Sequence, residues 1–408
     1  MLICHLAIGA KAHGVTLLDQ PAAAKLPETF ARWFAGRGWT PRPHQLELLA
    51  KAQSGRSVLL IAPTGGGKTL AGFLPSLVDL SEGVSPQAAV AERRRLLSTG
   101  RDVRREGGLH TLYISPLKAL AVDIARNLEA PIAEMQLPIR IETRTGDTPT
   151  SKRQRQRRDP PEILLTTPEQ LALLLASADA PYLFGSLRRI VLDELHALVT
   201  SKRGDLLSLD LARLFRLAPH IASIGLSATV AEPDDLCRFM VPQREVGGAA
   251  ARADLIVAQG GAEPHVVMLD SAEHVPWAGH SARYALGELY ALIKLHRTTL
   301  VFVNTRSQAE GIFQDLWHLN EDNLPIALHH GSLDVAQRRK VEGAMAAGTL
   351  RAVVCTSSLD LGVDWGDVDL VVNVGAPKGS SRLLQRIGRA NHRMDEPSEG
   401  VLIPANRF

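Results

Sequence analysis

The chain alternates between short runs of consecutive apolar residues and longer stretches in which apolar residues recur every three or four positions. The short runs are typical of strands buried on both faces, and the longer stretches are typical of amphipathic helices. Before residue 245, strands are predicted at 58–61, 111–115, 140–143, 163–165, 190–192 and 224–226. Strands that alternate with helices in this way predict a parallel sheet covered by helices.

The same alternation returns in the second half of the chain. Strands are predicted there at 300–303, 327–331, 352–355 and 370–373, the second of them running into a turn. Glycine pairs at 247–248 and 260–261 mark the crossing between the halves. The predicted fold class is therefore α/β, with two tandem parallel-sheet lobes. The predicted domains are an N-terminal extension (1–25), a first lobe (26–245), a linker with the start of the second lobe (246–280) and a second lobe (281–408).

Composition limits the class of protein without identifying a ligand. The 408 residues suffice for two or three domains, and 46 basic against 43 acidic residues leave a net charge of only +3. Any affinity for nucleic acid must therefore come from local clusters. Cys4, Cys237 and Cys355 are too far apart to suggest a zinc site or a disulfide framework. No apolar run reaches the roughly 18 residues of a membrane helix, and a signal peptide is not indicated, so a cytoplasmic protein is expected.

The strand at 58–61 leads into the segment Ala62-Pro63-Thr64-Gly65-Gly66-Gly67-Lys68-Thr69, and a helical pattern follows. Strand, glycine turn and helix form a phosphate-binding loop, because the glycines let successive N–H groups point at phosphate oxygens. Lys68 would reach the β- and γ-phosphates and the Thr69 hydroxyl would hold Mg²⁺. The residues predicted to contact the nucleotide here are Thr64, Gly65, Gly66, Gly67, Lys68 and Thr69. The alternative is an ordinary glycine-rich turn.

An acidic pair, Asp193 and Glu194, ends the strand at 190–192, and His196 follows. The carboxyl edge of a parallel sheet is where ligands bind, so this pair is expected to face the nucleotide. Asp193 would hold Mg²⁺, and Glu194 would orient and deprotonate the attacking water. Ser227 and Thr229 end the next strand and, with His196, would couple the acidic site to movement between the lobes. Capping of the strand end by their hydroxyls is the alternative for these two residues.

Several further segments have more than one possible role. Gln45 precedes a helix shortly before the glycine loop, where it would either read the adenine edge or cap that helix. Six arginines between 93 and 105 favour a solvated insertion over a nucleic-acid contact. The segment 151–158 holds five basic residues in eight, which fits an exposed helix face and a phosphate-binding flank about equally. Lys118 stands at a helix start whose free N–H groups would grip a backbone phosphate. Thr167 precedes a proline at another helix start, where its hydroxyl would either cap the helix or contact phosphate.

Taken together, these segments resemble a known family. The chain is similar to the superfamily 2 helicase core, and in particular to the DEXH-box branch of large helicase-related (Lhr) proteins, with wording that points to its ligase-associated DNA-repair subgroup. The matching segments are 62–69, 113–120, 144–148, 166–171, 193–196, 227–229, 301–306, 329–333, 356–364 and 385–393. They occur in the family's order, and the wording of 117–120 with 144–148 separates this branch from the DEAD-box RNA helicases.

The resemblance implies two RecA-like lobes with ATP and Mg²⁺ between them, and 3′-to-5′ movement along single-stranded DNA. It implies that Gly362 and Asp364 belong to the nucleotide-coupled part of the second lobe and that Arg389 is an arginine finger. Many relatives carry a second arginine where this chain has His392, so the assisting role of His392 or Arg393 stays open. By the same matching, the residues near the strand backbone are Pro116, Lys118, Thr148, Thr167, Asn304, Arg306 and Thr356.

The resemblance also sets expectations for partners and for alternatives. Lhr-type proteins continue into a winged-helix domain and further domains, so a chain ending at Phe408 is expected to lack them. DNA-repair nuclease and ligase partners are implied by the family alone. Two other functions share every motif: a nucleotide-dependent binding module without turnover, and an RNA-remodelling ATPase. The sequence does not show whether a 2′-hydroxyl is read, so it does not separate DNA from RNA.

Overall fold

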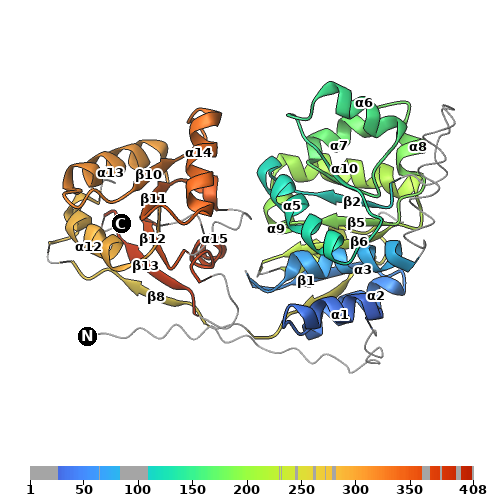
Figure 1. The fold of residues 1–408 in the computed structure, drawn as a ribbon, viewed down its shortest axis with the longest axis horizontal. Helices are drawn as coiled ribbons and strands as arrows, with labels where there is room; N and C mark the ends of the chain where they lie inside the picture. The colour runs from blue at the N-terminus through green and yellow to red at the C-terminus, as the bar shows by residue number, and fades with distance from the viewer. Residues whose placement is uncertain are drawn as a thin grey trace.

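A computed structural model of the chain provides the fold. It describes residues 26–63, 65–82, 109–228, 230, 232–243, 247–260, 263–271, 273–277, 282–360, 368–376, 379–391 and 397–406. Two α/β lobes are visible, the first in blue to green and the second in orange to red (Figure 1). The predicted extension at 1–25 and the arginine-rich segment at 93–105 lie outside the described residues.

The first lobe is built on a seven-stranded parallel sheet in the order β3-β4-β2-β5-β6-β1-β7. Five of its strands, including β1 and β5, are buried along their whole length, which explains their apolar runs. The strands are β1 (Val58–Ile61), β2 (Thr111–Ile114), β3 (Ile141–Arg144), β4 (Ile163–Thr166), β5 (Arg189–Leu192), β6 (Ala222–Ser227) and β7 (Asp254–Val257).

Helices cover both faces of this sheet and form a separate core on each face. One core joins α2, α3 and α5 to the sheet, and the other joins α7, α9 and α10 to it. The helices are α1 (Glu28–Gly36), α2 (Pro43–Gln53), α3 (Lys68–Glu82), α5 (Lys118–Glu134), α6 (Thr150–Arg158), α7 (Pro168–Leu175), α8 (Ala180–Phe184), α9 (Leu195–Val199), α10 (Lys202–Leu217) and α11 (Pro233–Phe239).

Strand β7 corrects the predicted domain boundary. It pairs in parallel with β1, from Val58 opposite Asp254 to Ile61 opposite Val257, so the first sheet continues past residue 245. The segment 254–257 falls within 246–280, which was expected to hold the linker and the start of the second lobe. It carries the apolar run Leu255-Ile256-Val257, but as an edge strand it buries only Ile256.

The second lobe repeats this architecture with a six-stranded parallel sheet in the order β10-β11-β9-β12-β13-β8. Its strands are β8 (His265–Met268), β9 (Thr299–Phe302), β10 (Ile326–His329), β11 (Ala352–Cys355), β12 (Leu370–Val374) and β13 (Glu399–Ile403). Its helices are α12 (Leu286–Leu295), α13 (Arg306–Leu319), α14 (Val335–Ala346), α15 (Ser380–Ile387), and the 3₁₀ turns η1 (Arg283–Ala285) and η2 (Ser357–Leu359). Two cores again lie on opposite faces of the sheet. The predicted class of two tandem RecA-like lobes is confirmed.

Candidate functional site

Parallel pairing gathers the predicted site residues at one edge of each sheet. In the first lobe, β5, β6 and β1 are neighbours, so the loops after them meet at their common carboxyl edge. These loops carry the glycine loop, the acidic pair and Ser227. The loops after β3, β4 and β2 continue along the same edge. Ligands bind at this edge of α/β sheets, so the topology by itself brings together residues more than 100 positions apart.

The glycine loop after β1 has the backbone shape expected of a phosphate-binding loop. Gly65 and Gly67 have φ angles of +74° and +70°, which side-chain-bearing residues rarely adopt. Lys68 is the first residue of α3, and its Nζ donates to the carbonyl oxygens of Ala62 at 2.7 Å and Pro63 at 3.1 Å. Its ammonium group is therefore held inside the loop. Thr69 lies in the first turn of α3, whereas Thr64 lies outside the described residues.

Helix α2 holds the glycine loop from outside. Gln45 is 3% exposed; its amide nitrogen donates to Gly67 O at 3.3 Å, and its amide oxygen accepts from the Arg42 N–H at 2.9 Å. His44 Nε2 lies 2.9 Å from Gly66 O, and the Arg42 guanidinium donates to Gly65 O at 3.3 Å. The helix-cap interpretation of Gln45 is confirmed, while its contact with adenine stays a prediction. His44 and Arg42 were missed, since only the fold brings their side chains to these carbonyls.

The acidic pair is buried beneath this loop. Asp193 Oδ2 accepts a 2.5 Å hydrogen bond from the Tyr113 hydroxyl, and Asp193 Oδ1 accepts one from the Glu194 N–H at 2.8 Å. Burial, followed by the charge of Glu194, raises the pKa of Asp193 to about 6. Burial lowers the pKa of Lys68, an effect that the nearby carboxylates of Glu194 and Asp193 oppose. Lys68 and the two acids thus lie within electrostatic reach of one another.

Glu194 has an unusual backbone and a carboxylate with little internal support. Its φ of +46° lies in the left-handed region, where a residue other than glycine is uncommon, and it turns the chain from β5 into α9. Glu194 Oε2 is buried, has no hydrogen-bond partner among the described residues, and lies 3.5 Å from His196 Nε2. Burial lowers the pKa of His196, so the ring is neutral at neutral pH and does not form an ion pair there.

His196 also connects the acidic pair to the neighbouring strand. Its Nδ1 lies 3.0 Å from the Ser227 hydroxyl at the end of β6, and Ser227 Oγ donates to Ala228 O at 2.9 Å. The structure therefore brings His196 and Ser227 together, as the proposed coupling requires. Thr229, the third residue of that predicted set, lies outside the described residues.

In the second lobe, Arg386 lies in the last turn of helix α15 and Arg389 follows the helix. Arg386 is 2% exposed and is fixed by Asp360 Oδ1 at 2.8 Å, by Asn373 Oδ1 at 2.6 Å, and by stacking over Phe302 at 4.8 Å. Its role in the fold was not predicted. It is structural, because both hydrogen bonds stay within the lobe.

Arg389, the predicted finger, is 6% exposed and donates to Asp360 O at 3.3 Å. Its positive charge adds to the lowering of the Lys68 pKa, so its guanidinium acts on the glycine loop of the other lobe. Gly362 and Asp364, and the alternatives His392 and Arg393, lie outside the described residues.

The predicted nucleic-acid residues of the first lobe stand on neighbouring loops. Lys118 is exposed at the start of α5 and pairs with Asp147 at 3.1 Å, which joins the loop after β2 to the loop after β3. The Thr148 hydroxyl accepts from the Thr145 N–H at 2.9 Å, and Thr167 is the residue before α7. These loops are adjacent because β2, β4 and β3 are adjacent strands.

Arg203 connects two of these loops and was not predicted. Its guanidinium forms an ion pair with both carboxylate oxygens of Glu169 in the first turn of α7, and donates to Pro116 O at 2.6 Å. A planar guanidinium that bonds in this forked manner fixes both partners at once. The Pro116 loop and the start of α7 thus form one rigid surface. The only signal in the sequence was a basic residue at a helix start.

The candidates of the second lobe follow its own carboxyl edge. Asn304 follows β9 and donates to Ala376 O at 2.8 Å, whereas Arg306 begins α13 and pairs with Glu310 at 2.8 Å. Thr356 follows β11, and its N–H donates to His329 O at 3.3 Å. All three stand at strand ends that are neighbours in the sheet order β10-β11-β9-β12.

The structure also bears on the cysteines, on metal clusters and on membrane helices. Cys237 and Cys355 are buried free thiols. Within the described ranges, no cluster of three or more His, Cys, Asp or Glu side chains is arranged to hold a metal ion. No helix in the part of the chain that the structure describes is both long and apolar enough to cross a bilayer.

Comparison with known proteins agrees with this geometry. Residues 42–236 match the DEAD/DEAH box helicase family, and residues 284–394 match the helicase conserved C-terminal domain. The chain is 38% identical over 407 residues to ATP-dependent helicase Lhr-Core protein 2 of Thermococcus barophilus, covering 95% of this chain and 45% of that protein. The chain belongs to the Lhr helicase family.

Two further relatives place the chain within the Lhr family. It is 37% identical over 400 residues to ATP-dependent helicase Lhr-Core of Methanocaldococcus jannaschii, covering 95% of this chain and 45% of that protein. A solved structure of Mycobacterium smegmatis helicase Lhr, bound to single-stranded DNA and AMP-PNP, is 34% identical with a TM-score of 0.77, covering 93% of this chain and 48% of that one. The chain thus spans about half the length of these relatives. Nothing in these matches addresses the ligase-associated subgroup, which stays a prediction.

Proposed function

We propose that this chain is an ATP-driven motor that moves along single-stranded DNA in the 3′-to-5′ direction. The observation that carries the proposal is the meeting of the glycine loop, the acidic pair and Arg389. Lys68, Glu194 and Asp193 lie at one sheet edge, and the charge of Arg389 reaches Lys68 from the second lobe. A nucleotide bound at such a seam contacts both lobes, so its hydrolysis would change how they sit together.

The residues at this edge fit a Mg²⁺ ion bound with the nucleotide. Mg²⁺ prefers oxygen ligands, and the Thr69 hydroxyl and Asp193 carboxylate supply them. The Asp193 carboxylate is already fixed by the Tyr113 hydroxyl and the Glu194 N–H, so little further ordering is needed. When bound, the ion would neutralise negative charge on the β- and γ-phosphates.

The protein groups then have separate tasks. The unsatisfied Glu194 Oε2 would accept a proton from the attacking water, because its neighbour His196 is neutral and leaves the carboxylate free to act as a base. The Lys68 ammonium donates to two carbonyl oxygens in this structure and would donate to the phosphate oxygens when nucleotide is bound. Arg389 would stabilise charge on the transferred phosphoryl group, while His196 and Ser227 would relay the change between neighbouring strands.

Single-stranded nucleic acid would lie across the carboxyl edges of both lobes. The loops with Pro116, Lys118, Thr148 and Thr167 offer N–H groups, hydroxyls and a cation to phosphate oxygens in the first lobe. Asn304, Arg306 and Thr356 would do so in the second. The choice of DNA is supported by the DNA-bound relative, and the direction rests on the family resemblance alone. A role in DNA repair with nuclease and ligase partners is proposed on the family resemblance alone.

Steady-state ATP hydrolysis by the purified chain, with and without single-stranded DNA, tests the proposal. We expect stimulation by DNA that exceeds stimulation by RNA of the same sequence. The affinity for single-stranded DNA should fall as salt rises. A plot of the logarithm of the binding constant against the logarithm of the salt concentration should have a slope of about −0.7 per phosphate contact. Tight ATP binding without turnover in either condition would instead indicate a nucleotide-dependent binding module, and equal or greater stimulation by RNA would indicate an RNA-remodelling enzyme.

The Tyr113 hydroxyl is expected to set the affinity for Mg²⁺. Tyr113→Phe keeps the ring, which stacks on Phe73 of α3 at 5.4 Å, and removes the hydroxyl that bonds Asp193 and also contacts Ser115. A hydrogen bond to a charged group contributes about 1.5 to 3 kcal/mol. The Mg²⁺ concentration that gives half-maximal turnover should therefore rise at least about tenfold in the variant. Titration of ATP hydrolysis with Mg²⁺ measures this. An unchanged Mg²⁺ dependence would remove Tyr113 from the positioning of Asp193.

A further inference from the structure

Helices α6 and α14 occupy the same topological place in the two lobes. Each follows an outermost strand of its sheet, β3 in the first lobe and β10 in the second, and returns beside that strand. Both helices lie along the upper side of the molecule (Figure 1). Both are rich in basic residues, with Lys152, Arg153, Arg155, Arg157 and Arg158 on α6, and Arg338, Arg339 and Lys340 on α14.

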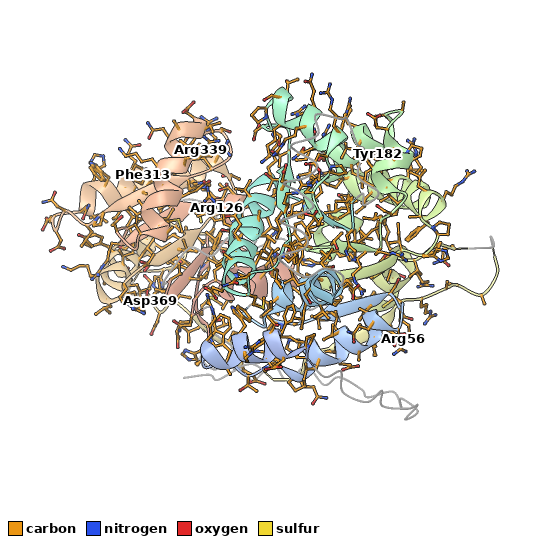
Figure 2. The ribbon with its side chains drawn as sticks, turned by 45° about the vertical axis from the view of Figure 1, so that its right-hand side comes forward. Arg56, Arg126, Tyr182, Phe313, Arg339 and Asp369 are labelled. Carbon is orange, nitrogen blue, oxygen red and sulfur yellow. The ribbon has the colours of Figure 1, made fainter. Side chains whose placement is uncertain are left out.

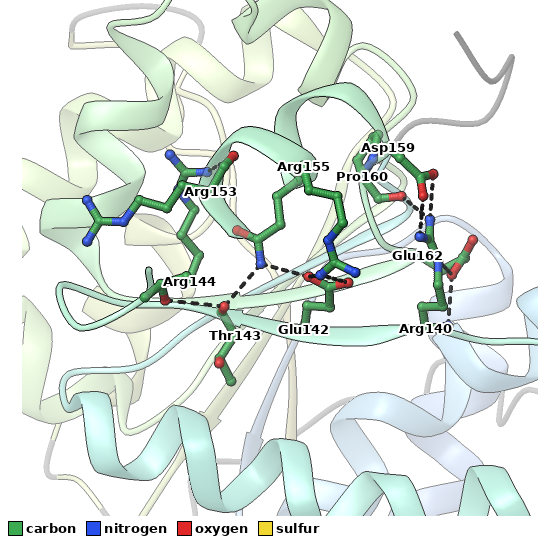
Figure 3. Close-up of polar contacts among 11 residues, drawn as sticks. Arg140, Glu142, Thr143, Arg144, Arg153, Arg155, Asp159, Pro160 and Glu162 are labelled. Atoms are coloured by element: carbon green, nitrogen blue, oxygen red, sulfur yellow. Dashed lines mark hydrogen bonds and ion pairs between the residues drawn. The ribbon is translucent and has the colours of Figure 1, made fainter. Parts of the chain in front are cut away.

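Part of this charge anchors α6 to the sheet. Arg155 donates to both oxygens of Glu142 at 2.8 and 2.7 Å, and Gln156 bonds the same carboxylate at 2.9 Å (Figure 3). At the far end, Arg140 of the first lobe pairs with Asp159 directly after the helix. The helix is therefore fixed along β3, and Arg155 and Arg140 have their charges compensated within the protein.

Other cations of this region lack such compensation. The Arg153 guanidinium donates to the carbonyl oxygens of Thr145 and Gly146 at 3.2 and 2.6 Å, which bonds its protons without neutralising its charge. Arg144 beside it is 5% exposed, and burial together with the charges of Arg157 and Arg153 lowers the pKa of Arg144 to about 10. Like charges packed this closely repel each other, and an anion nearby would relieve the repulsion.

Five cations on the two helices have no acidic partner among the residues that the structure describes. Lys152, Arg157 and Arg158 on α6 form no ion pair with any carboxylate of the described residues, and the same holds for Arg339 and Lys340 on α14. The acid on α14 points elsewhere, since Glu342 contacts His329 Nε2 at 3.2 Å. Arg339 projects from the upper side of the second lobe (Figure 2). These five cations form one set, which we call the basic rim.

We propose that the basic rim binds the phosphate backbone of duplex nucleic acid that adjoins the single strand on the motor. This rests on the proposed function. The predicted strand-binding residue Thr148 lies just before α6, and Arg158 stands eight residues past the helix start at Thr150, about 12 Å along the axis. That length matches the roughly 12 Å width of the major groove, across which the two backbones face each other. One strand of the duplex would contact the loop that holds Thr148, and the complementary strand would contact the end of α6 at Arg158.

Two double variants test the basic rim, namely Arg157→Gln with Arg158→Gln, and Arg339→Gln with Lys340→Gln. The probes are a short single-stranded DNA and the same strand extended by a duplex, with binding followed by fluorescence anisotropy. Wild type should bind the extended probe more tightly than the single strand. Each variant should bind the extended probe about tenfold more weakly, with a salt slope reduced by about 2 for two lost contacts. Binding of the single strand and DNA-stimulated turnover should not change.

The matched control is Arg188→Gln with Arg216→Gln, which removes two exposed positive charges at the amino end of the first sheet, away from the strand-binding loops. It should bind both probes like wild type. Equal weakening by control and rim variants would mean a general charge effect and would overturn the proposal. So would equal weakening of both probes by the rim variants, which would assign the rim to the single-strand path. Failure of the wild type to bind single-stranded DNA would instead refute the proposed function.

Discussion

Replacing Glu194 with glutamine is expected to lower the rate of ATP hydrolysis by about 10²- to 10⁴-fold while leaving nucleotide binding intact. Glutamine preserves the size of the side chain but cannot accept a proton. The carboxylate is 8% exposed, and its Oε2 has no hydrogen-bond partner among the described residues, so no internal contact is lost there. Steady-state hydrolysis and equilibrium binding of a fluorescent ATP analogue measure the two effects separately.

Glu129→Gln is the matched control for this experiment. It removes the same charge from an exposed position on α5, and turnover should match wild type. If Glu194→Gln also hydrolyses ATP at the wild-type rate, then Glu194 is not the base. If it fails to bind nucleotide, the loss of turnover would reflect damage to the pocket, since the left-handed backbone at this position makes the local turn sensitive.

Truncation of Arg389 to alanine is expected to reduce turnover by about 10³- to 10⁵-fold, the range known for arginines that reach a transferred phosphoryl group. The reason is that its guanidinium, carried by the second lobe, contributes to the lowering of the pKa of Lys68. Nucleotide binding should change far less, because the glycine loop is intact. The rate with saturating ATP and single-stranded DNA, compared with the dissociation constant of the nucleotide, provides the test.

Because Arg389 is 6% exposed, folding must be checked beside activity. Arg386→Lys serves as the comparison, because Arg386 is held by Asp360 and Asn373. This substitution should lower the melting temperature more than it lowers the rate of ATP hydrolysis. Arg389→Ala with a wild-type melting temperature and wild-type turnover would exclude Arg389 as the finger and leave that role to Arg393 or His392.

The sequence predicted whatever depends on neighbours along the chain. Buried strands such as β1 and β5 have unbroken apolar runs, and the glycine loop requires residues that are consecutive, so both were found from the pattern. Strand β7 was missed although it has an apolar run, Leu255-Ile256-Val257. The run lies between the glycine pairs at 247–248 and 260–261, which predicted the crossing between the lobes.

Contacts between distant residues were beyond the sequence. Tyr113 and Asp193 are 80 positions apart, and Arg203 and Pro116 are 87 apart, yet each pair is joined by a hydrogen bond. Tyr113 appeared in the pattern only as part of a strand. Such pairs follow from strand order and helix packing, which a single sequence does not reveal. Gln45 shows the same limit, because its cap is local to α2 and was predicted, whereas its contact with Gly67 exists only once α2 lies against the loop.

The two sheets share no strand pairing within the described ranges, and each lobe has cores of its own. Close-packed cores resist deformation, so a ligand between the lobes would move each lobe as a rigid body and would not bend either one. The chain passes between the lobes after β7 and before β8, which lie near the lower side of Figure 1, whereas α6 and α14 lie on the upper side. A small closure of the lobes around the nucleotide would therefore produce a larger displacement at α6 and α14.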